Sequence, residues 1–262
     1  MLRFLLIALI AMPSSSLLLP QAIGQSLTAA RDLEFRIDTD VYSDESKPPV
    51  TSTKAMFLKD RALEWDDSHQ RLMVIDYAKG LIELADFRSK RTCTLSMVEL
   101  ESKLDQLRAE LTEDQIRNWA SPTPPQAQPD GSTVLQSERI KYQFIASRPK
   151  LPGMSSAYAE FADWSVRVAA VYPPFKPPLL RMQLNQHLLE TERLPTEIKL
   201  WDLRSKNSEP LVARLLIQEG LSDQDRQRIN DWNTLSATLK PVSPSEYFQS
   251  PSLANSKTTP AK

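Results

Sequence analysis

Residues 53–118 constrain the fold most, because they combine closely spaced strand-like runs with a long amphipathic helix. The runs are apolar or alternating, and polar turn clusters separate them: 54–59, 63–66, 72–77, 81–87 and 91–95. Strands joined by such short turns pair antiparallel, since a parallel return needs a crossover of a dozen or more residues. This stretch therefore predicts an antiparallel meander.

A helix is expected directly after the meander. Ser96 is followed three residues later by Glu99, which is the spacing of a capping box. Apolar residues then recur at spacings of four, three and four: Leu100, Leu104, Leu107 and Leu111. These positions share one side of a helix, which predicts that the helix lays a single apolar stripe on the sheet.

The N-terminus has the pattern of a secretory signal peptide. Arg3 precedes the apolar segments 4–12 and 17–19, and Ala22 and Gly24 have the small-x-small spacing that signal peptidase accepts. A membrane anchor is the alternative, but the apolar core is shorter than the roughly 20 residues of a spanning helix. We expect residues 1–24 to be a signal peptide that is cleaved near Gly24.

Cleavage would leave Gln25 at the new N-terminus, so no cysteine is there to carry a lipid. The expected mature protein is therefore periplasmic or secreted, soluble, and without stable membrane insertion. A net charge of −1, from 32 basic and 33 acidic residues, argues against nucleic acid or an anionic membrane as partner. Cys93 is the only cysteine, so no internal disulfide can form.

The rest of the chain alternates between strands and helices. Strands are expected at 32–42, 138–147, 197–203 and 211–219, the last two as a hairpin, and helices at 155–172, 177–192 and 222–239. Residues 121–132 read as a flexible connector, and no internal repeat is evident. The second half has too few strands for a stable sheet of its own, so they should extend the first sheet. We expect one α+β domain over residues 31–248 and a disordered tail at 249–262.

A resemblance follows from this order of elements. The first strand at 33–41, the meander, the helices and a late strand with the sequence LPTEIKLWD at 194–202 together resemble the periplasmic lipoprotein-carrier superfamily, which includes the outer-membrane lipoprotein localisation factors. The chain is also similar to uncharacterised secreted proteins of planctomycete-type bacteria, for which no activity is implied. The carrier resemblance implies a curved antiparallel sheet, an incomplete barrel, covered by helices and enclosing an apolar cavity. It implies a lipid or lipoprotein acyl chain as partner.

Residues suited to catalysis are few. His69 follows Asp66 and Asp67 in a turn, where a metal or general-base site competes with a solvated turn, and the latter is favoured. Cys93 could meet His69 across neighbouring strands as a nucleophile and base, but a buried structural cysteine is favoured. His187 lies beside an apolar helical face and is read as a core or flanking histidine. We therefore expect no catalytic residue, no metal, no cofactor and no enzymatic activity.

Two functions remain open. The first is an exported, non-catalytic binding protein whose concave sheet face holds an apolar group, with Phe35, Ile37, Trp65 and Leu84 as candidate lining residues. The second is a structural or protein-interaction module of the cell envelope, in which the helices fill the sheet and leave no cavity. The oligomeric state and the identity of any ligand are not encoded in these patterns.

Overall fold

The structure is a computed structural model that describes residues 33–172, 178–205 and 209–249. Twelve strands of these ranges form one sheet in the order β12-β6-β5-β4-β3-β2-β1-β11-β10-β9-β8-β7. β1 (Phe35–Tyr42) pairs with β2 (Thr51–Leu58) on one side and with β11 (Leu211–Glu219) on the other. Strands from both halves of the chain thus share one sheet, as predicted. The expected signal peptide, 1–24, and the tail from residue 250 lie outside the described residues.

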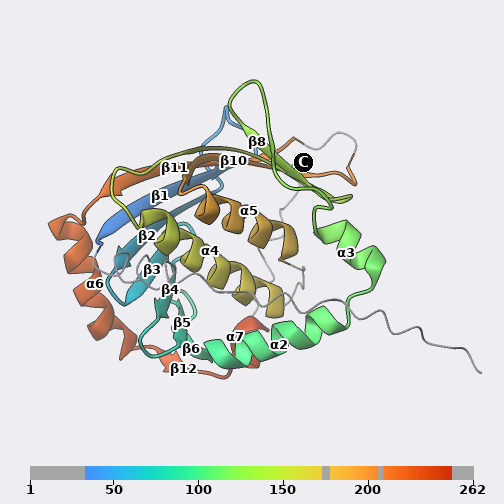
Figure 1. Cartoon of the computed structure of the whole chain (residues 1–262). Helices are drawn as coiled ribbons and strands as arrows, with labels where there is room; N and C mark the ends of the chain where they lie inside the picture. The colour runs from blue at the N-terminus through green and yellow to red at the C-terminus, as the bar shows by residue number, and fades with distance from the viewer. Residues whose placement is uncertain (1–32, 173–177, 206–208, 250–262) are drawn as a thin grey trace, which may run out of the picture.

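The predicted fold class, α+β with a curved antiparallel sheet, is confirmed. All pairings within the described ranges are antiparallel except the short contact of β12 (Lys240–Pro241) with β6 (Arg91–Ser96). The sheet bends around two helices without closing into a barrel (Figure 1). The second-half strands β9 (Ile140–Ser147) and β10 (Leu194–Asp202) continue from β11, so the predicted hairpin of β10 with β11 is present.

The meander contains a structural repeat that the sequence reading missed. β3 (Arg61–Asp66), β4 (Arg71–Asp76), β5 (Leu81–Asp86) and β6 begin ten residues apart. The last residue of each of the first three strands is an aspartate, and one of its carboxylate oxygens accepts the backbone N–H three residues later, at 3.0, 2.9 and 3.0 Å. A residue with positive φ then closes each turn: Gln70, Gly80 and Lys90. The expectation of no repeat was wrong because few residues are identical between the units, chiefly the aspartate that ends β3, β4 and β5 and the arginine that begins β3, β4 and β6.

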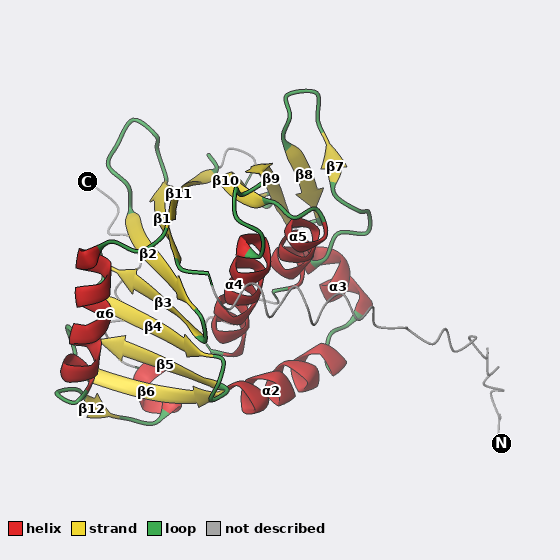
Figure 2. Cartoon of the chain, turned by 60° about the vertical axis from the view of Figure 1, so that its left-hand side comes forward, coloured by secondary structure: helices red, strands yellow, loops and turns green. Residues whose placement is uncertain are grey.

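Two helices cover the concave face of the sheet. α4 (Met154–Val171) and α5 (Leu179–Glu190) lie inside the curve, and α2 (Met97–Ala109) runs from the end of β6 (Figures 1 and 2). The helix expected at 155–172 is present as α4, and its Phe161, Trp164 and Val168 are buried. The Ser96 hydroxyl accepts the Glu99 N–H at 3.4 Å, so α2 begins at the predicted cap.

The convex face has its own core beneath α6 (Asp223–Ser236). Ile229 and Trp232 of this helix pack against outward-facing strand residues such as Met56 and Leu72. Asp225 forms a capping box with Ser222 and also accepts two hydrogen bonds from Arg36 of β1, at 2.8 and 2.9 Å. The carboxylate thus fixes both the start of α6 and its position on the sheet.

Several short elements were not predicted. The expected connector at 121–132 contains β7 (Gln126–Ala127), which pairs with β8 (Thr133–Gln136) at the edge of the sheet. β12 and α7 (Pro244–Phe248) follow α6. Elements of two to five residues are too short to show a hydrophobic period, so only their tertiary pairing reveals them. Thr112 and Gln115 form a capping box that begins α3 (Glu113–Trp119).

Candidate functional site

An apolar pocket of about 410 Å³ lies between the concave face of the sheet and α4. Its floor comes from β1, β2, β3, β9, β10 and β11, and α4 forms its roof, with one side chain from α5. We refer to this hollow as the apolar pocket. Several of its lining side chains, from both the sheet and α4, are small: Ala55, Ala213, Ala162 and Ser165. A volume of this size lies within the range of small-molecule sites, about 300–1,000 Å³.

Of the candidate lining residues, Ile37 lines the apolar pocket. Phe35 lies two residues earlier on the same face of β1 but is fully buried, where its ring stacks on Phe57 at 4.2 Å. Phe57 in turn meets Phe161 of α4 edge to face at 5.3 Å. Leu84 is buried in β5, four strands along the sheet from β1, and is not among the residues that line the pocket.

Trp65 corrects the expectation that it would share the concave face with these residues. Successive residues of a strand point to opposite faces, and Glu64 is the neighbour that faces the apolar pocket. Trp65 therefore points to the convex face, where it is buried with Trp232 of α6. Arg228 lies over its ring at 4.8 Å from the centroid. The alternation in residues 63–66 shows that Leu63 and Trp65 share a face, but it could not decide whether that face is the concave or the convex one.

The apolar pocket contains one carboxylic acid, Glu64, on β3. The pKa of Glu64 is raised to about 7, mainly by burial and also by the nearby Asp66 carboxylate, while a hydrogen bond with Thr53 opposes the shift. Apolar surroundings disfavour the charged carboxylate relative to the neutral acid, and this difference raises the pKa of Glu64. Glu64 is thus near half protonation at neutral pH.

The opposite end of the apolar pocket contains one cation, Arg181, at the start of α5. Its Nη2 donates a hydrogen bond to the Tyr158 hydroxyl at 3.0 Å. Burial alone would lower the pKa of Arg181, but Tyr158, Tyr142 and Asp163 together raise it, so the group stays charged. Five strand spacings, about 24 Å along the sheet, separate the strand of Glu64 from that of Tyr142.

Sequence reasoning missed both charged groups. Glu64 lies between the apolar residues Leu63 and Trp65 of one strand. This single acid was the available signal for a charged group on the concave face. Arg181 directly follows Leu180, whose apolar stripe continues through Leu184. A charge beside a buried stripe usually reaches solvent, and only the packing of α5 over β9 directs this one inward.

The structure separates Cys93 from His69. His69 lies in the turn before β4, and Cys93 lies on β6, so two strand spacings of about 9.5 Å in total separate their strands. Cys93 is also the third residue of β6, two positions after Arg91, which increases its distance from the turn. His69 instead contacts Asp66, with Nδ1 and Oδ2 2.7 Å apart. Burial raises the pKa of the Cys93 thiol to about 12, so it is a poor nucleophile at neutral pH. This geometry removes the support for a hydrolase built on the two residues.

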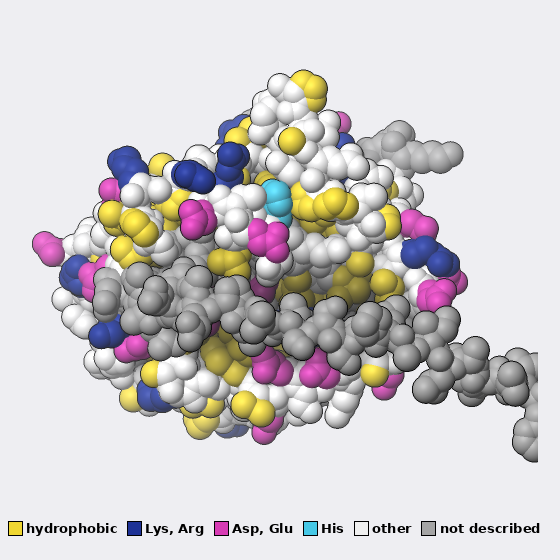
Figure 3. Space-filling model, viewed as in Figure 1, with side chains coloured by type: hydrophobic (Ala, Val, Ile, Leu, Met, Phe, Trp, Pro, Cys, Tyr) yellow, Lys and Arg dark blue, Asp and Glu magenta, His cyan; other side chains and the backbone are white. Residues whose placement is uncertain are grey.

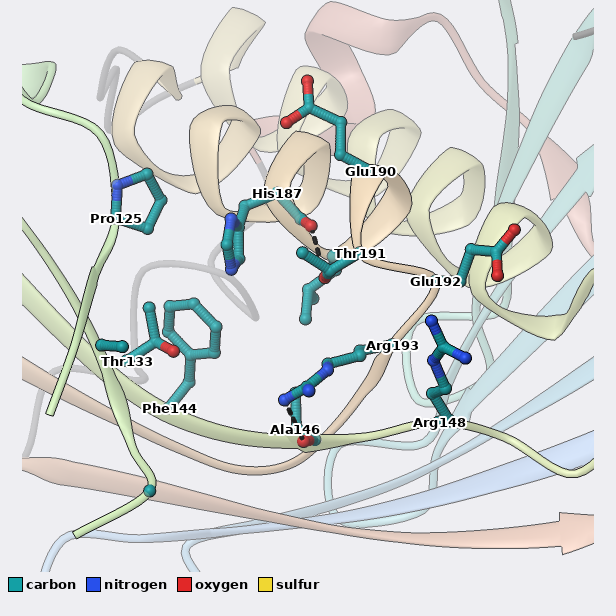
Figure 4. A pocket seen from close by; sticks show the side chains of 13 residues that line it. Pro125, Thr133, Phe144, Ala146, Arg148, His187, Glu190, Thr191, Glu192 and Arg193 are labelled. Carbon is teal, nitrogen blue, oxygen red and sulfur yellow. Dashed lines mark hydrogen bonds between the residues drawn. The ribbon is translucent and has the colours of Figure 1, made fainter. Parts of the chain in front are cut away.

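A second hollow, which we call the His187 cleft, lies where the end of α5 faces β9 and the β7–β8 hairpin. It has a volume of about 520 Å³ and a mixed, largely polar lining (Figure 4). The His187 ring meets Phe144 edge to face at 5.8 Å, and burial lowers the pKa of His187. Arg193 donates to the Ala146 carbonyl at 3.5 Å across the cleft. Nothing in this arrangement pairs His187 with a nucleophile.

Other surfaces of the described residues add no clear site. Among these residues, no group of three or more histidine, cysteine, aspartate or glutamate side chains is placed to hold a metal ion. Asp67, next to Asp66, forms an ion pair with Arg228 of α6. Basic and acidic side chains are interspersed on the face shown in Figure 3. None of the described helices is long and apolar enough to cross a membrane.

Comparison with known proteins gives little further information. No model of a protein family matches the chain, and no curated protein matches it. A solved structure of PNGF-II is similar over 86% of this chain, with 8% identity and a TM-score of 0.37, and this chain spans 33% of its length. An uncharacterized conserved protein from Thermus thermophilus is similar over 85% of this chain and 98% of its own, with 7% identity and a TM-score of 0.36. These likenesses are too weak to bear on function.

Proposed function

We propose that this protein binds an apolar ligand, such as a lipid acyl chain, in the apolar pocket and does so without catalysis. The observation that carries the proposal is a hollow of about 410 Å³ with a mainly aliphatic and aromatic lining between the sheet and α4. The hollow opens to solvent, because lining residues such as Leu211 are exposed, and an uncovered hollow with so apolar a lining favours a binding protein over a structural module with a filled core.

The chemistry of the pocket supports binding without reaction. Its acid, Glu64, and its cation, Arg181, lie at opposite ends, so they do not form a general acid–base pair around one bond. A curved open sheet with helices inside the curve is also what the resemblance to lipoprotein carriers implies. The signal-peptide pattern at 1–24 supports action in the periplasm or outside the cell.

Filling the pocket from α4 should weaken binding. Val166 lines the pocket and is only partly buried, so a tryptophan at this position can occupy the pocket without displacing core residues. We expect Val166→Trp to weaken binding of N-phenylnaphthylamine, a neutral dye that fluoresces in apolar surroundings, by at least about tenfold, which corresponds to 1.4 kcal/mol. Fluorescence titration of the purified mature protein measures the effect.

Ala169→Trp is the matched control, because Ala169 lies on the exposed side of the same helix. It should change dye affinity by less than about twofold, and circular dichroism should show that both variants are folded. Binding that persists in folded Val166→Trp would place the dye elsewhere and remove the pocket as its site. Absence of binding to the folded wild-type protein would favour the filled, structural role.

A further inference from the structure

The cation at one end of the apolar pocket has no described counter-ion. Arg181 makes one hydrogen bond, to Tyr158, and within the described ranges it forms no ion pair. The acid that influences it, Asp163, accepts a hydrogen bond from Asn185 at 2.7 Å and lies 4.0 Å from Arg167. Asp163 is therefore already engaged by other groups.

The remaining acid of the pocket does not neutralise Arg181. Glu64 is on β3, five strand spacings from β9, which carries the Tyr142 ring beside Arg181. A guanidinium has five N–H donors in a planar fork, and one of them is used by Tyr158. The hydroxyl groups of Tyr158 and Tyr142 keep their own O–H donors. Donors and positive charge thus converge at one end of a hollow that is otherwise mainly apolar.

From this arrangement we infer that the ligand is an amphiphile with a single carboxylate head, bound by Arg181 and Tyr158, and an alkyl tail along the pocket beneath α4. The inference rests on the proposed function, because it names the class of ligand for the same pocket. A carboxylate matches the guanidinium fork with two parallel hydrogen bonds, which makes this pairing stronger and more specific than one to a neutral group. A phosphate monoester carries more charge than the one cation balances, so a carboxylate fits better.

The test compares ligands that share a tail and differ in head group. Dodecanoate, dodecanol and dodecyl phosphate compete with N-phenylnaphthylamine for the wild-type mature protein at pH 8, each below its micelle-forming concentration. We expect dodecanoate to bind at least about tenfold more tightly than dodecanol, a difference of 1.4 kcal/mol. Dodecyl phosphate should bind more weakly than dodecanoate, and the reverse order would assign the head-group site to phosphate and overturn the carboxylate.

Variants of Arg181 test whether this residue causes the preference for dodecanoate over dodecanol. Arg181→Met keeps roughly the length of the side chain and removes its charge, so the advantage of dodecanoate over dodecanol should fall below about threefold. Arg181→Lys should retain part of the advantage, and it serves in place of Arg181→Met if that variant is unfolded. Arg226→Met, at an exposed position of α6 on the convex face, should keep the full advantage.

The outcomes separate this inference from the proposed function. Equal binding of dodecanoate and dodecanol to the wild-type protein would overturn the carboxylate head while leaving an apolar site in place. Selectivity that survives in folded Arg181→Met would assign the head group to another residue and also overturn the inference. Failure of the dye and of all three amphiphiles to bind would instead contradict the proposed function itself.

Discussion

Replacing Glu64 with glutamine is expected to raise the free energy of unfolding by up to about 3 kcal/mol at pH 8 and to leave it nearly unchanged at pH 4. The pKa of Glu64 is about 7 in the folded protein, against 4.5 in the absence of the fold. Between these values the folded state holds the proton more tightly, so the wild-type protein loses stability as pH rises from about 4.5 to 7. The two pKa values differ by about 2.5, and each unit corresponds to about 1.36 kcal/mol, which sets the upper limit of the gain in the free energy of unfolding.

Urea unfolding at several pH values measures this effect as the difference between variant and wild type, which removes the contribution of other titrating groups. Glu110→Gln is the matched control, because Glu110 is exposed at the end of α2. Its effect should stay within about 0.5 kcal/mol at every pH. A Glu64→Gln effect with the same size at pH 4 and pH 8 would show that the carboxyl is not held in an apolar environment.

Replacing Phe35 with alanine is expected to lower the free energy of unfolding by about 4 kcal/mol, within the 3–5 kcal/mol seen when a buried phenylalanine is truncated. Phe35 is fully buried, stacks on Phe57 and lies in the core that joins the sheet to α4. The substitution removes the buried ring and leaves a cavity beside the pocket wall. Urea unfolding at neutral pH measures the loss.

Two variants control for this result. Phe35→Leu retains most of the apolar volume, so it should cost clearly less than alanine, about 1 kcal/mol. Leu216→Ala, on β11, removes a side chain that is 61% exposed and should change stability by no more than about 0.5 kcal/mol. A loss under about 1 kcal/mol for Phe35→Ala would mean that the packed rings of Phe35, Phe57 and Phe161 do not hold α4 against the sheet.

Most of the fold could be predicted because its long elements repeat with a clear period. β1 alternates between apolar and polar residues, and α4 has its buried residues at helical spacing, so both were predicted within a few positions. β11 was predicted with its observed bounds. The β7–β8 hairpin was missed because Gln126 and Ala127 carry no alternation, and their pairing depends on the neighbouring strand.

The candidate site could be predicted only in part, because a pocket depends on which residues face one another across layers. Ile37 was identified from the alternation of β1, which fixes its face. Trp65 was misplaced because the alternation of residues 63–66 shows which side chains share a face of β3 but not which face becomes concave, and the pairing of β3 with β2 and β4 decides that. Glu64 and Arg181 lie more than a hundred residues apart, and only the packing of α5 over the curved sheet brings both into one pocket.

The central claim is that the hollow beneath α4 is where an apolar ligand binds. Isotope-filtered nuclear Overhauser spectroscopy tests it most directly, with the isotope-labelled mature protein and unlabelled N-phenylnaphthylamine at saturation. We predict contacts from the dye to the methyl groups of Ile37, Ala55 and Ala162, which line the pocket on the sheet and on α4. Contacts only to methyl groups of the convex face, such as Leu63 and Leu72, would contradict it.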